Sequence, residues 1–282
     1  MPEGDTIFRT ARTLERALAG RTITRFESAL ARLTRTDDDG PLAGRTVEHV
    51  EARGKWLLMF LSGDLVLLTH MLMNGSWHIY RVGEPWRRAR RDMRIVVETA
   101  EWTAVAFAVP VAEFHTSESL ARKEGVTTLG PDLLQSGFDA ADAARRLRGL
   151  AGMELGPALL NQRVMAGIGN VFKSEICFAC GVNPFARVES LTARQVERIL
   201  DVSQRYLRMN VREDREGFIG VNDGSRRTTG SLDAKVRLWV YGRRGEPCRR
   251  CGSAIQMRKQ GADARNSFWC GECQPLTGLT VE

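Results

Sequence analysis

Two pairs of cysteines near the end of the sequence constrain this chain more than any other feature. Cys248 and Cys251 form one Cys-x-x-Cys pair, and Cys270 and Cys273 form a second, with residues 252–269 between them. Two such pairs, separated by a segment long enough for a β-hairpin, can supply four thiolates to one tetrahedral zinc ion. The sequence therefore predicts a structural zinc site in this region.

The segment around this predicted zinc site is strongly basic. Residues 226–265 carry eleven Lys and Arg against three acidic residues, so 11 − 3 = +8, about the whole chain's net charge of +7. A pI near 9.4 fits a polyanionic partner such as a nucleic acid, although charge alone identifies no partner. Two interpretations stay open at this point: an ordinary solvated zinc ribbon, or a zinc-stapled hairpin that presents arginine to phosphate.

The apolar segments and the other cysteines indicate the cellular setting. The longest apolar runs, Trp56–Leu61 and Leu65–Leu68, are too short to span a bilayer. Residues 1–5 do not resemble a basic-then-apolar leader, so we expect no secretion signal. Four of the six cysteines have metal-ligand spacing, which favours a reducing interior over a disulfide scaffold. Cys177 and Cys180 lie in an apolar segment without a second ligand pair, and we predict that they are buried thiols.

The N-terminal segment predicts an amphipathic helix that ends at Gly20, with Asp5 or Thr6 as its N-cap. Its apolar face recurs at spacings of four, three and four: Ile7, Ala11, Leu14 and Leu18. Because such a helix packs into a core, it would hold the first residues of the chain in place.

Residues 21–115 predict a β-sandwich or barrel, since short strands alternate with Gly, Asp and Pro clusters. The expected strands are Thr22–Phe26, Val47–Glu51, Trp56–Leu61, Leu65–Leu72, Arg94–Val97 and Thr103–Val109. Lys55 stands at the entry to an apolar strand, where a solvated charge is the ordinary interpretation. Met71 and Met73 precede a turn at Asn74-Gly75, and composition alone favours a place in the core for both.

The pattern becomes helical after Leu129-Gly130-Pro131, which we interpret as a domain boundary. The expected helices are Ala140–Leu150, Gly156–Val164, Val171–Cys180 and Thr192–Val211. Thr192 and Gln195 form a capping box for the last of these. Residues 213–230 are polar and contain several glycines, which is typical of a long loop.

A short turn separates the second and third expected helices. Gly167 and Gly169 lie two residues apart, and Asn170 opens the next helix. Free backbone N–H groups in such a turn, together with the helix dipole, form a cradle for phosphate. Glycine is also common in helix–turn–helix units for steric reasons alone, so the turn by itself does not identify a function.

Taken together, these motifs resemble the formamidopyrimidine-DNA glycosylase/endonuclease VIII family, in the family's order and over nearly the whole chain. The motifs are Met1–Thr6, Gly54-Lys55, Asn161–Asn170, Val240–Arg243 and the four-cysteine finger. The resemblance implies an α+β multidomain DNA repair enzyme. Its expected parts are an N-terminal catalytic β-sandwich (1–130), a helical helix-two-turn-helix domain (131–235) and a C-terminal zinc finger (236–282).

The resemblance also implies catalytic roles. Removal of Met1 leaves Pro2 as a secondary amine, which titrates near neutrality and can attack a sugar carbon to form a Schiff base. By the same resemblance, Glu3 is the acid/base and Lys55 lies at the sugar–phosphate. Arg265 clamps phosphate and supports the final elimination, and its planar guanidinium suits that task. The DNA contacts implied are Leu72, Met73, Asn74, Asn170, Tyr241 and Arg243.

Two departures favour the endonuclease VIII branch. Residues 2–6 read Pro-Glu-Gly-Asp-Thr in place of Pro-Glu-Leu-Pro-Glu, and the strand at 103–109 lacks the Arg-Phe-Gly wedge of the oxidised-purine glycosylases. In the endonuclease VIII branch one loop fills the gap left by the extruded nucleotide, which here implies Leu72, Met73 and Asn74, with Met73 as the principal wedge. The segment between the cysteine pairs is slightly longer than the family pattern.

The expected function is therefore a bifunctional glycosylase and abasic-site lyase of base excision repair that favours oxidised pyrimidines and cleaves by β,δ-elimination. The alternatives are an oxidised-purine glycosylase and a non-catalytic protein that binds damaged DNA. We expect one structural zinc ion, no organic cofactor, damaged double-stranded DNA as partner, no membrane association and a monomer. By resemblance, the protein is expected in the bacterial cytoplasm, associated with the nucleoid.

Overall fold

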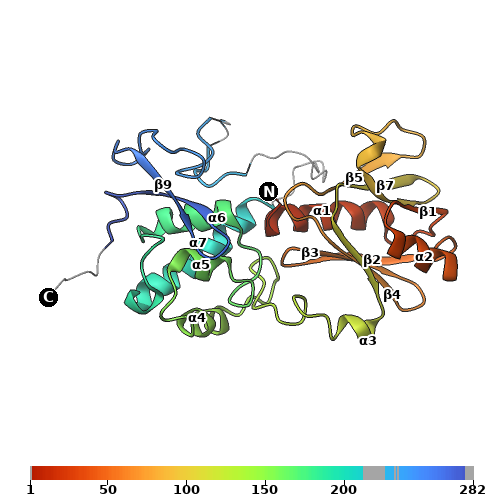
Figure 1. Ribbon diagram of the computed structural model, residues 1–282, viewed down its shortest axis with the longest axis horizontal. Helices are drawn as coiled ribbons and strands as arrows, with labels where there is room; N and C mark the ends of the chain where they lie inside the picture. The colour runs from red at the N-terminus through yellow and green to blue at the C-terminus, as the bar shows by residue number, and fades with distance from the viewer. Residues whose placement is uncertain (1, 212–225, 232, 234, 277–282) are drawn as a thin grey trace. The chain divides into compact units, whose positions relative to one another are not determined.

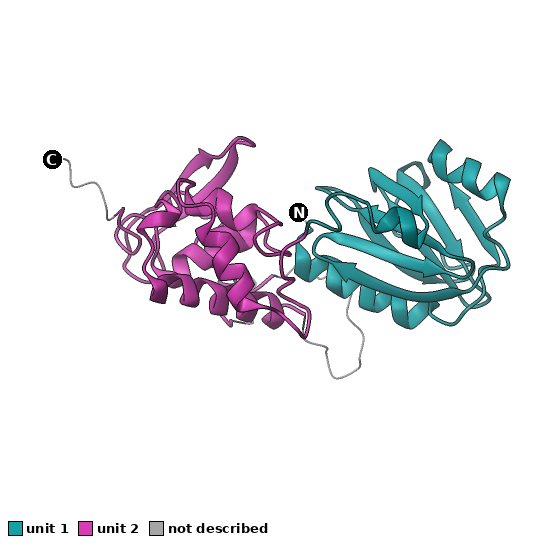
Figure 2. Cartoon of the chain, turned by 90° about the horizontal axis from the view of Figure 1, so that it is seen from below, with its two compact units in different colours: residues 1–128, 213–223 teal, residues 129–212, 224–282 magenta. Residues whose placement is uncertain are grey.

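The computed structural model describes residues 2–211, 226–231, 233 and 235–276. These residues form two compact units: the first is built from the chain up to Thr128, and the second begins at Leu129 (Figure 2). The second unit contains both the helical region and the four cysteines, so the regions expected at 131–235 and 236–282 pack on each other. The greater part of the loop expected at 213–230 lies outside the described residues.

The first unit is a β-sandwich of two antiparallel four-stranded sheets (Figure 1). The strand order is β1-β6-β7-β5 in one sheet and β2-β3-β4-β8 in the other. The strands are β1 (Arg25–Ser28), β2 (Val47–Arg53), β3 (Trp56–Leu61), β4 (Leu65–His70), β5 (Ser76–Arg81), β6 (Met93–Glu98), β7 (Trp102–Phe107) and β8 (Val111–His115). The helices are α1 (Gly4–Leu18), α2 (Ala31–Asp39), α3 (Ser117–Leu120) and the 3₁₀ turn η1 (Arg90–Asp92).

The core of this sandwich is closed by α1, which contacts strands of both sheets. The predicted apolar face is confirmed, since Ile7, Ala11, Leu14 and Leu18 are all buried. Full burial of an Ile or Leu side chain contributes roughly 1.5–3 kcal/mol, so this face fixes the helix firmly. The start of the helix differs from the prediction: α1 begins at Gly4, and Glu3 is its N-cap without a side-chain cap bond. Asp5 lies inside the first turn, and its buried carboxylate is 4.0 Å from the guanidinium of Arg9 one turn later.

The predicted strands agree with the structure where the apolar pattern is strong. The bounds of β3 match the prediction, and β2, β6 and β7 lie within two residues of it. The strand expected at Thr22–Phe26 lies later, at β1, because Thr22 forms only an isolated bridge to Thr46. β4 ends two residues early, because Leu72 takes a positive φ of 46° where the chain turns. The prediction missed β5, β8, α2 and α3.

The described residues of the second unit pack four α-helices, a 3₁₀ turn and a β-hairpin around two apolar clusters. The elements are α4 (Ala140–Arg148), α5 (Leu155–Leu160), α6 (Asn170–Cys180), η2 (Val188–Ser190), α7 (Ala193–Met209), β9 (Ile255–Gln260) and β10 (Arg265–Cys270). The capping box at Thr192 and Gln195 is confirmed. α6 is buried on nearly every side, since Phe172 and Ile176 pack among the helices while Phe178 packs against the hairpin.

The hairpin pairs β9 and β10 antiparallel, from Arg265 opposite Gln260 to Cys270 opposite Ile255. Residues 261–264 form its tip, where Gly261 (φ 72°) and Ala264 (φ 49°) are left-handed. No helix within the described residues is long and apolar enough to cross a membrane.

Candidate active site, metal centre and DNA-contact residues

Pro2 and Glu3 are held at the start of a buried helix. The Glu3 carbonyl accepts hydrogen bonds from the Thr6 and Ile7 N–H groups at 3.0 and 3.1 Å, which closes the first turn of α1. The Glu3 side chain is fully buried, whereas Pro2 is half-buried. A carboxyl group shielded from water thus stands beside the residue that would carry the terminal amine, both at the positive end of a helix dipole.

Lys55 occupies the second position of a two-residue hairpin turn between β2 and β3, with Arg53 paired to Trp56 across it. Gly54, the first position, has a φ of 58°, which an L residue rarely adopts. Trp56 is paired in turn with His70 on β4, and burial together with the Lys55 charge lowers the pKa of His70 to about 4. His70 is therefore neutral at physiological pH, and the charge beside it that lowers its pKa belongs to Lys55.

Residues 72–74, here called the 72–74 turn, form a closed turn at the end of β4. The Gly75 N–H donates to the Met71 carbonyl at 2.9 Å, and a Cβ at Gly75 would lie 2.6 Å from that oxygen. The Leu72 N–H donates to His70 Nδ1 at 3.1 Å, which the neutral imidazole can accept. Sequence reasoning did not single out His70; its position just before the turn was the available signal.

The structure separates the two methionines that composition placed in the core. Met71 is buried, as expected, but Met73 is 55 % exposed and its neighbour Leu72 is 47 % exposed. The core interpretation is therefore wrong for Met73. The 72–74 turn therefore presents two exposed apolar side chains, those of Leu72 and Met73, beside the polar Asn74.

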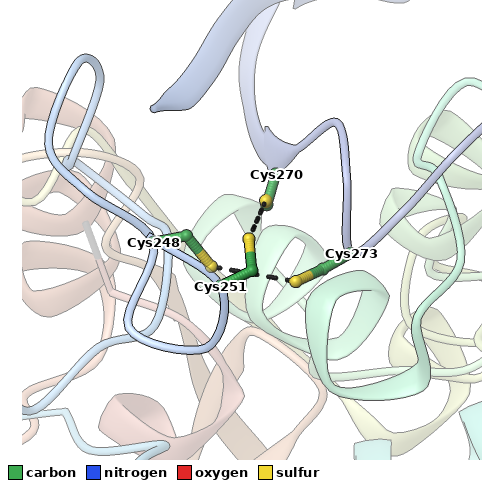
Figure 3. Close-up of side chains that lie close together, drawn as sticks. All are labelled: Cys248, Cys251, Cys270 and Cys273. Atoms are coloured by element: carbon green, nitrogen blue, oxygen red, sulfur yellow. Dashed lines mark hydrogen bonds between the residues drawn. The ribbon is translucent and has the colours of Figure 1, made fainter. Parts of the chain in front are cut away.

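The four cysteines of the two pairs converge on one point (Figure 3). All four Sγ atoms lie within 4.8 Å of one another, with Cys251 and Cys270 at 3.4 Å and Cys248 and Cys273 at 3.9 Å. A tetrahedral zinc ion with Zn–S bonds of about 2.3 Å places its sulfurs at comparable separations, so the donors fit the ion in number, type and spacing.

Cys177 and Cys180 lie apart from this centre on α6. Among the described residues they belong to no group that could hold a metal ion. The predicted burial is confirmed for Cys177, whereas Cys180 is only partly buried. Burial raises the pKa of Cys177 far above its ordinary value and that of Cys180 to about 12, so both remain protonated thiols. Such thiols are poor metal ligands, since the thiolate is the binding form.

Asn170 and Arg265 are brought together by the hairpin. Asn170 Nδ2 donates to the Asn266 carbonyl at 3.0 Å, and Arg265 is the preceding residue of β10. Lys173, one turn along α6 and fully buried, donates to Ser267 Oγ at 2.7 Å and to the same carbonyl at 3.3 Å. The Arg265 side chain is 42 % exposed and, with Lys173, lines a cavity of about 310 Å³. Lys173 was not predicted as a site residue.

In the turn before Asn170, a side chain already bonds backbone groups that the sequence suggested would be free. Gly167 N–H donates to Gln162 Oε1 at 3.0 Å, and Gln162 Nε2 donates to the Leu160 and Ile168 carbonyls. The expected free N–H cradle is therefore wrong at Gly167, because the glutamine side chain satisfies that group. The polar atom without a partner here is Asn170 Oδ1, which is buried and accepts no hydrogen bond within the described chain.

Arg243 does not have the surface position expected of a DNA contact. It is 8 % exposed, and its guanidinium donates to the Trp239 and Pro247 carbonyls and to the Glu246 carboxylate. These bonds fold the chain around Cys248, so the role that the structure supports for Arg243 is structural. Tyr241 is half-buried and packs its ring on Phe268 at 5.0 Å.

Glu175 is a further residue that sequence reasoning missed. Its fully buried carboxylate accepts the Trp239, Val240 and Tyr241 N–H groups at 2.8–2.9 Å, and it also accepts the Thr228 hydroxyl. A carboxylate that receives several N–H groups replaces its lost hydration. Glu175 thereby ties α6 to the segment that leads into the zinc centre.

Comparison with known proteins agrees with this architecture. The formamidopyrimidine-DNA glycosylase N-terminal domain matches residues 1–110, and the H2TH domain of the same enzymes matches 129–220. The zinc finger found in FPG and IleRS matches 245–276. The chain belongs to the formamidopyrimidine-DNA glycosylase/endonuclease VIII family. Within this family its similarity to proteins named endonuclease 8 places it in the endonuclease VIII branch.

The chain is 40 % identical over 278 residues to the probable endonuclease 8 2 of Streptomyces coelicolor, covering 97 % of this chain and 94 % of that protein. It is 37 % identical to the DNA-(apurinic or apyrimidinic site) lyase Nei2 of Mycolicibacterium smegmatis, covering 97 % and 99 %. A solved complex of Lactococcus lactis Fpg with abasic-site DNA has a TM-score of 0.80 at 23 % identity, covering 97 % and 100 %. That similarity supports the fold.

Proposed function

We propose that this protein is a bifunctional DNA glycosylase and abasic-site lyase of base excision repair, with oxidised pyrimidines as its main substrates. The observation that carries the proposal is the start of the chain: Pro2 and the buried Glu3 are fixed by α1 in a member of this enzyme family. The relatives named endonuclease 8 and abasic-site lyase support both activities.

The chemistry begins with Pro2 after removal of Met1. An α-amino group has a pKa of about 8, so a useful fraction is unprotonated at neutral pH. Its lone pair attacks the sugar C1′, the electrons of the C1′–base bond leave with the damaged base, and that base takes up the proton that the Pro2 nitrogen loses. Glu3 protonates the ring oxygen, which opens the sugar and leaves an iminium between Pro2 and C1′. Loss of a C2′ proton then expels the 3′ phosphate, and loss of a C4′ proton expels the 5′ phosphate.

Three residues would hold the phosphates during these eliminations. Lys55 on the β2–β3 turn supplies a compact charge, and Asn170 has a second Nδ2 hydrogen besides the one given to Asn266. Arg265 offers an exposed guanidinium, whose fork suits phosphate oxygens. The zinc ion held by the four cysteines acts structurally, because it joins the turn at Cys248 to the strand that carries Arg265.

The exposed 72–74 turn would fill the space left in the duplex. Extrusion of a base costs a few kcal/mol, and an apolar side chain inserted at the vacated step recovers part of that cost. Met73 is the more exposed of the two apolar members of the turn and has an adaptable, unbranched side chain. The preference for pyrimidines rests on this single-loop arrangement and on the endonuclease 8 relatives. We further propose that the protein acts as a monomer on the bacterial chromosome.

Borohydride trapping tests this proposal. The enzyme is incubated with duplexes that carry an oxidised pyrimidine, 8-oxoguanine or an abasic site, and covalent complexes are counted after reduction. We expect trapping on all substrates that are cut, and faster trapping on the oxidised pyrimidine than on 8-oxoguanine. A preparation that retains Met1 should trap nothing, since an amide nitrogen is not nucleophilic, yet it should still bind DNA.

The other outcomes identify the alternatives. Faster trapping on 8-oxoguanine indicates an oxidised-purine glycosylase. Binding to damaged duplexes without any cleavage indicates a non-catalytic damage-binding protein. Trapping that persists when Met1 is retained places the nucleophile elsewhere, for example at Lys55.

A further inference from the structure

The β5–β6 connection contains a run of arginines whose role the site described above does not explain. Arg87, Arg88, Arg90 and Arg91 follow Trp86 in this connection. Arg87, Arg90 and Arg91 are exposed, whereas Arg88 turns inward and is partly buried. An inward arginine in an otherwise solvated basic loop needs a structural reason, and its contacts supply one.

Arg88 reaches back to the residues that follow the 72–74 turn. Its Nη1 donates to Ser76 Oγ at 3.0 Å and lies 3.5 Å from the Asn74 carbonyl. Its Nη2 lies 3.5 Å from Asp92 Oδ2, and its guanidinium carbon lies 5.6 Å from the centre of the Phe107 ring. The guanidinium is thus held by an acid, a hydroxyl and an aromatic face while it touches the end of the turn.

Ser76 is fixed by a second set of bonds. Tyr80 OH accepts the Arg87 N–H at 3.1 Å and lies 3.2 Å from His78 Nδ1, while His78 Nε2 lies 3.0 Å from Ser76 Oγ. Burial and the charges of Arg88 and Arg87 lower the pKa of His78 to about 4, so its ring is neutral. A neutral ring that accepts from Tyr80 carries its proton on Nε2 and donates it to Ser76.

The two ends of the 72–74 turn are therefore held by different side chains. His70 accepts the Leu72 N–H at the first end, and Arg88 with Ser76 holds the last end. The bond from Gly75 to Met71 closes the turn between them. A short turn held at both ends presents Met73 in one direction, and a group that must enter a base stack benefits from such preorganisation.

We propose that Arg88 is a positioning residue for the 72–74 turn, which it aims so that Met73 enters the duplex when a damaged base is extruded. This inference rests on the proposed function and adds a residue to it. Arg88 itself touches neither the base nor the reacting sugar. Its effect should be largest where extrusion is hard and smallest where the base is already missing.

The test compares single-turnover cleavage of two duplexes, one with 5-hydroxyuracil and one with a preformed abasic site at the same position. The measured quantity is the ratio of the two rates. We expect Arg88→Met to lower this ratio at least about fivefold, since small misplacements of positioning groups cost tenfold or more. Arg88→Lys keeps the positive charge but loses the planar guanidinium with its several N–H donors. Its ratio of rates should therefore lie between those of Arg88→Met and wild type.

Arg91→Met is the matched control. Arg91 lies three residues away, its side chain is exposed, and within the described part of the chain it bonds only through its carbonyl, to Arg94. The variant removes the same charge, and the ratio should stay within about twofold of wild type. Ser76→Ala removes only the hydroxyl that Arg88 bonds. Ser76→Ala should lower the ratio of rates by part of the amount seen in Arg88→Met. If Arg88→Met melts well below wild type, Ser76→Ala takes its place in the test.

A double-mutant cycle with Met73→Ala decides the mechanism. If Arg88 acts through Met73, the Met73→Ala/Arg88→Met enzyme should be no worse than Met73→Ala alone. The proposal would be overturned if the losses of Met73→Ala and Arg88→Met multiplied in the double variant. It would also be overturned if Arg88→Met and Ser76→Ala left the ratio of rates unchanged, or if Arg91→Met lowered that ratio as much as Arg88→Met. An unchanged ratio in Met73→Ala itself would remove the wedge and this inference together, whereas a wild type that cuts neither duplex would reject the proposed function.

Discussion

In the first unit, the residues predicted to act on DNA stand at the ends of regular elements, and all of them except the buried Glu3 are at least partly exposed. Pro2 precedes α1, Lys55 lies on a two-residue turn, and Met73 projects from a closed turn. In the second unit, the predicted residue Asn170 belongs to a buried polar network together with Lys173 and Glu175, which were not predicted. Asn170, Lys173 and Glu175 lie on α6 and grip the hairpin or the segment before it.

This contrast predicts that substitutions in the two units have different effects on stability and activity. A side chain at an exposed turn can be replaced with little loss of stability, so a loss of activity there reports on chemistry. A side chain within a buried network carries stability and position together. Substitutions in the second unit should therefore lower the melting temperature as well as DNA affinity, and the following predictions test that difference.

Loss of zinc should have the largest effect. Structural zinc contributes folding free energy directly, of order 10 kcal/mol in isolated finger peptides. Cys251→Ser should lose the metal and bind lesion DNA at least about tenfold more weakly, or 1.4 kcal/mol. Metal analysis and a titration with labelled duplex check this. Cys177→Ala/Cys180→Ala should keep one zinc per chain, and loss of zinc in that double variant would show that the metal centre has been misassigned.

Glu175→Gln should have the next largest effect. The amide nitrogen of glutamine cannot accept the N–H groups that the carboxylate oxygens now receive, so at least one buried donor is left without a partner. Such a group costs about 1–3 kcal/mol, and the melting temperature should fall by several degrees. Glu197→Gln makes the same chemical change on the exposed face of α7 and should melt within about a degree of wild type. Equal melting of the two variants would contradict the anchoring role.

Arg243 and Arg265 allow a direct comparison within the second unit, since the family resemblance implied contact with DNA for Arg243 and with phosphate for Arg265. Each phosphate contact contributes about 0.9 to the slope of log K against log salt on duplex DNA. Arg265→Met should reduce that slope by about one unit and leave the melting temperature near wild type. Arg243→Met should lower the melting temperature and leave the slope unchanged, because its guanidinium is bonded internally. The reverse result would return Arg243 to the DNA interface.

The features that could be predicted from the sequence are those that depend on residues close together in the chain. The face of α1, the bounds of β3 and the cysteine set depend on local periodicity and spacing, and they were predicted. β5 was missed because Trp77, His78 and Tyr80 are all buried, which hides the alternation of a half-exposed strand. α2 was missed because Leu33 is its one buried residue. Glu175 accepts N–H groups from 64–66 residues away, so nothing near it in the sequence reveals its partners.

The smallest predicted effect concerns pH, and it compares two histidines within the first unit. Burial, and then nearby cations, lower the pKa of His70 and of His78 from 6.5 to about 4. The unfolded chain therefore binds protons between pH 6.5 and 4 that the folded chain refuses, and stability is lost as pH falls through that window. The pKa values of Glu98 and Glu113 are lowered from 4.5 by their cationic partners, so their contribution is lost mainly at lower pH.

The interval between pH 6.5 and 5 thus reports chiefly on the histidines. His70→Gln keeps an acceptor for the Leu72 N–H but does not titrate, so its melting temperature should decrease less than that of wild type over this interval. His78→Gln should likewise reduce the decrease in melting temperature over this interval. It should leave the surroundings of Lys55 unchanged, because the cations beside His78 are Arg88 and Arg87. Melting curves at half-unit steps of pH measure both. If the two variants keep the wild-type slope, the neutral imidazoles are not the source of the acid sensitivity, and the support inferred for the 72–74 turn loses its electrostatic basis.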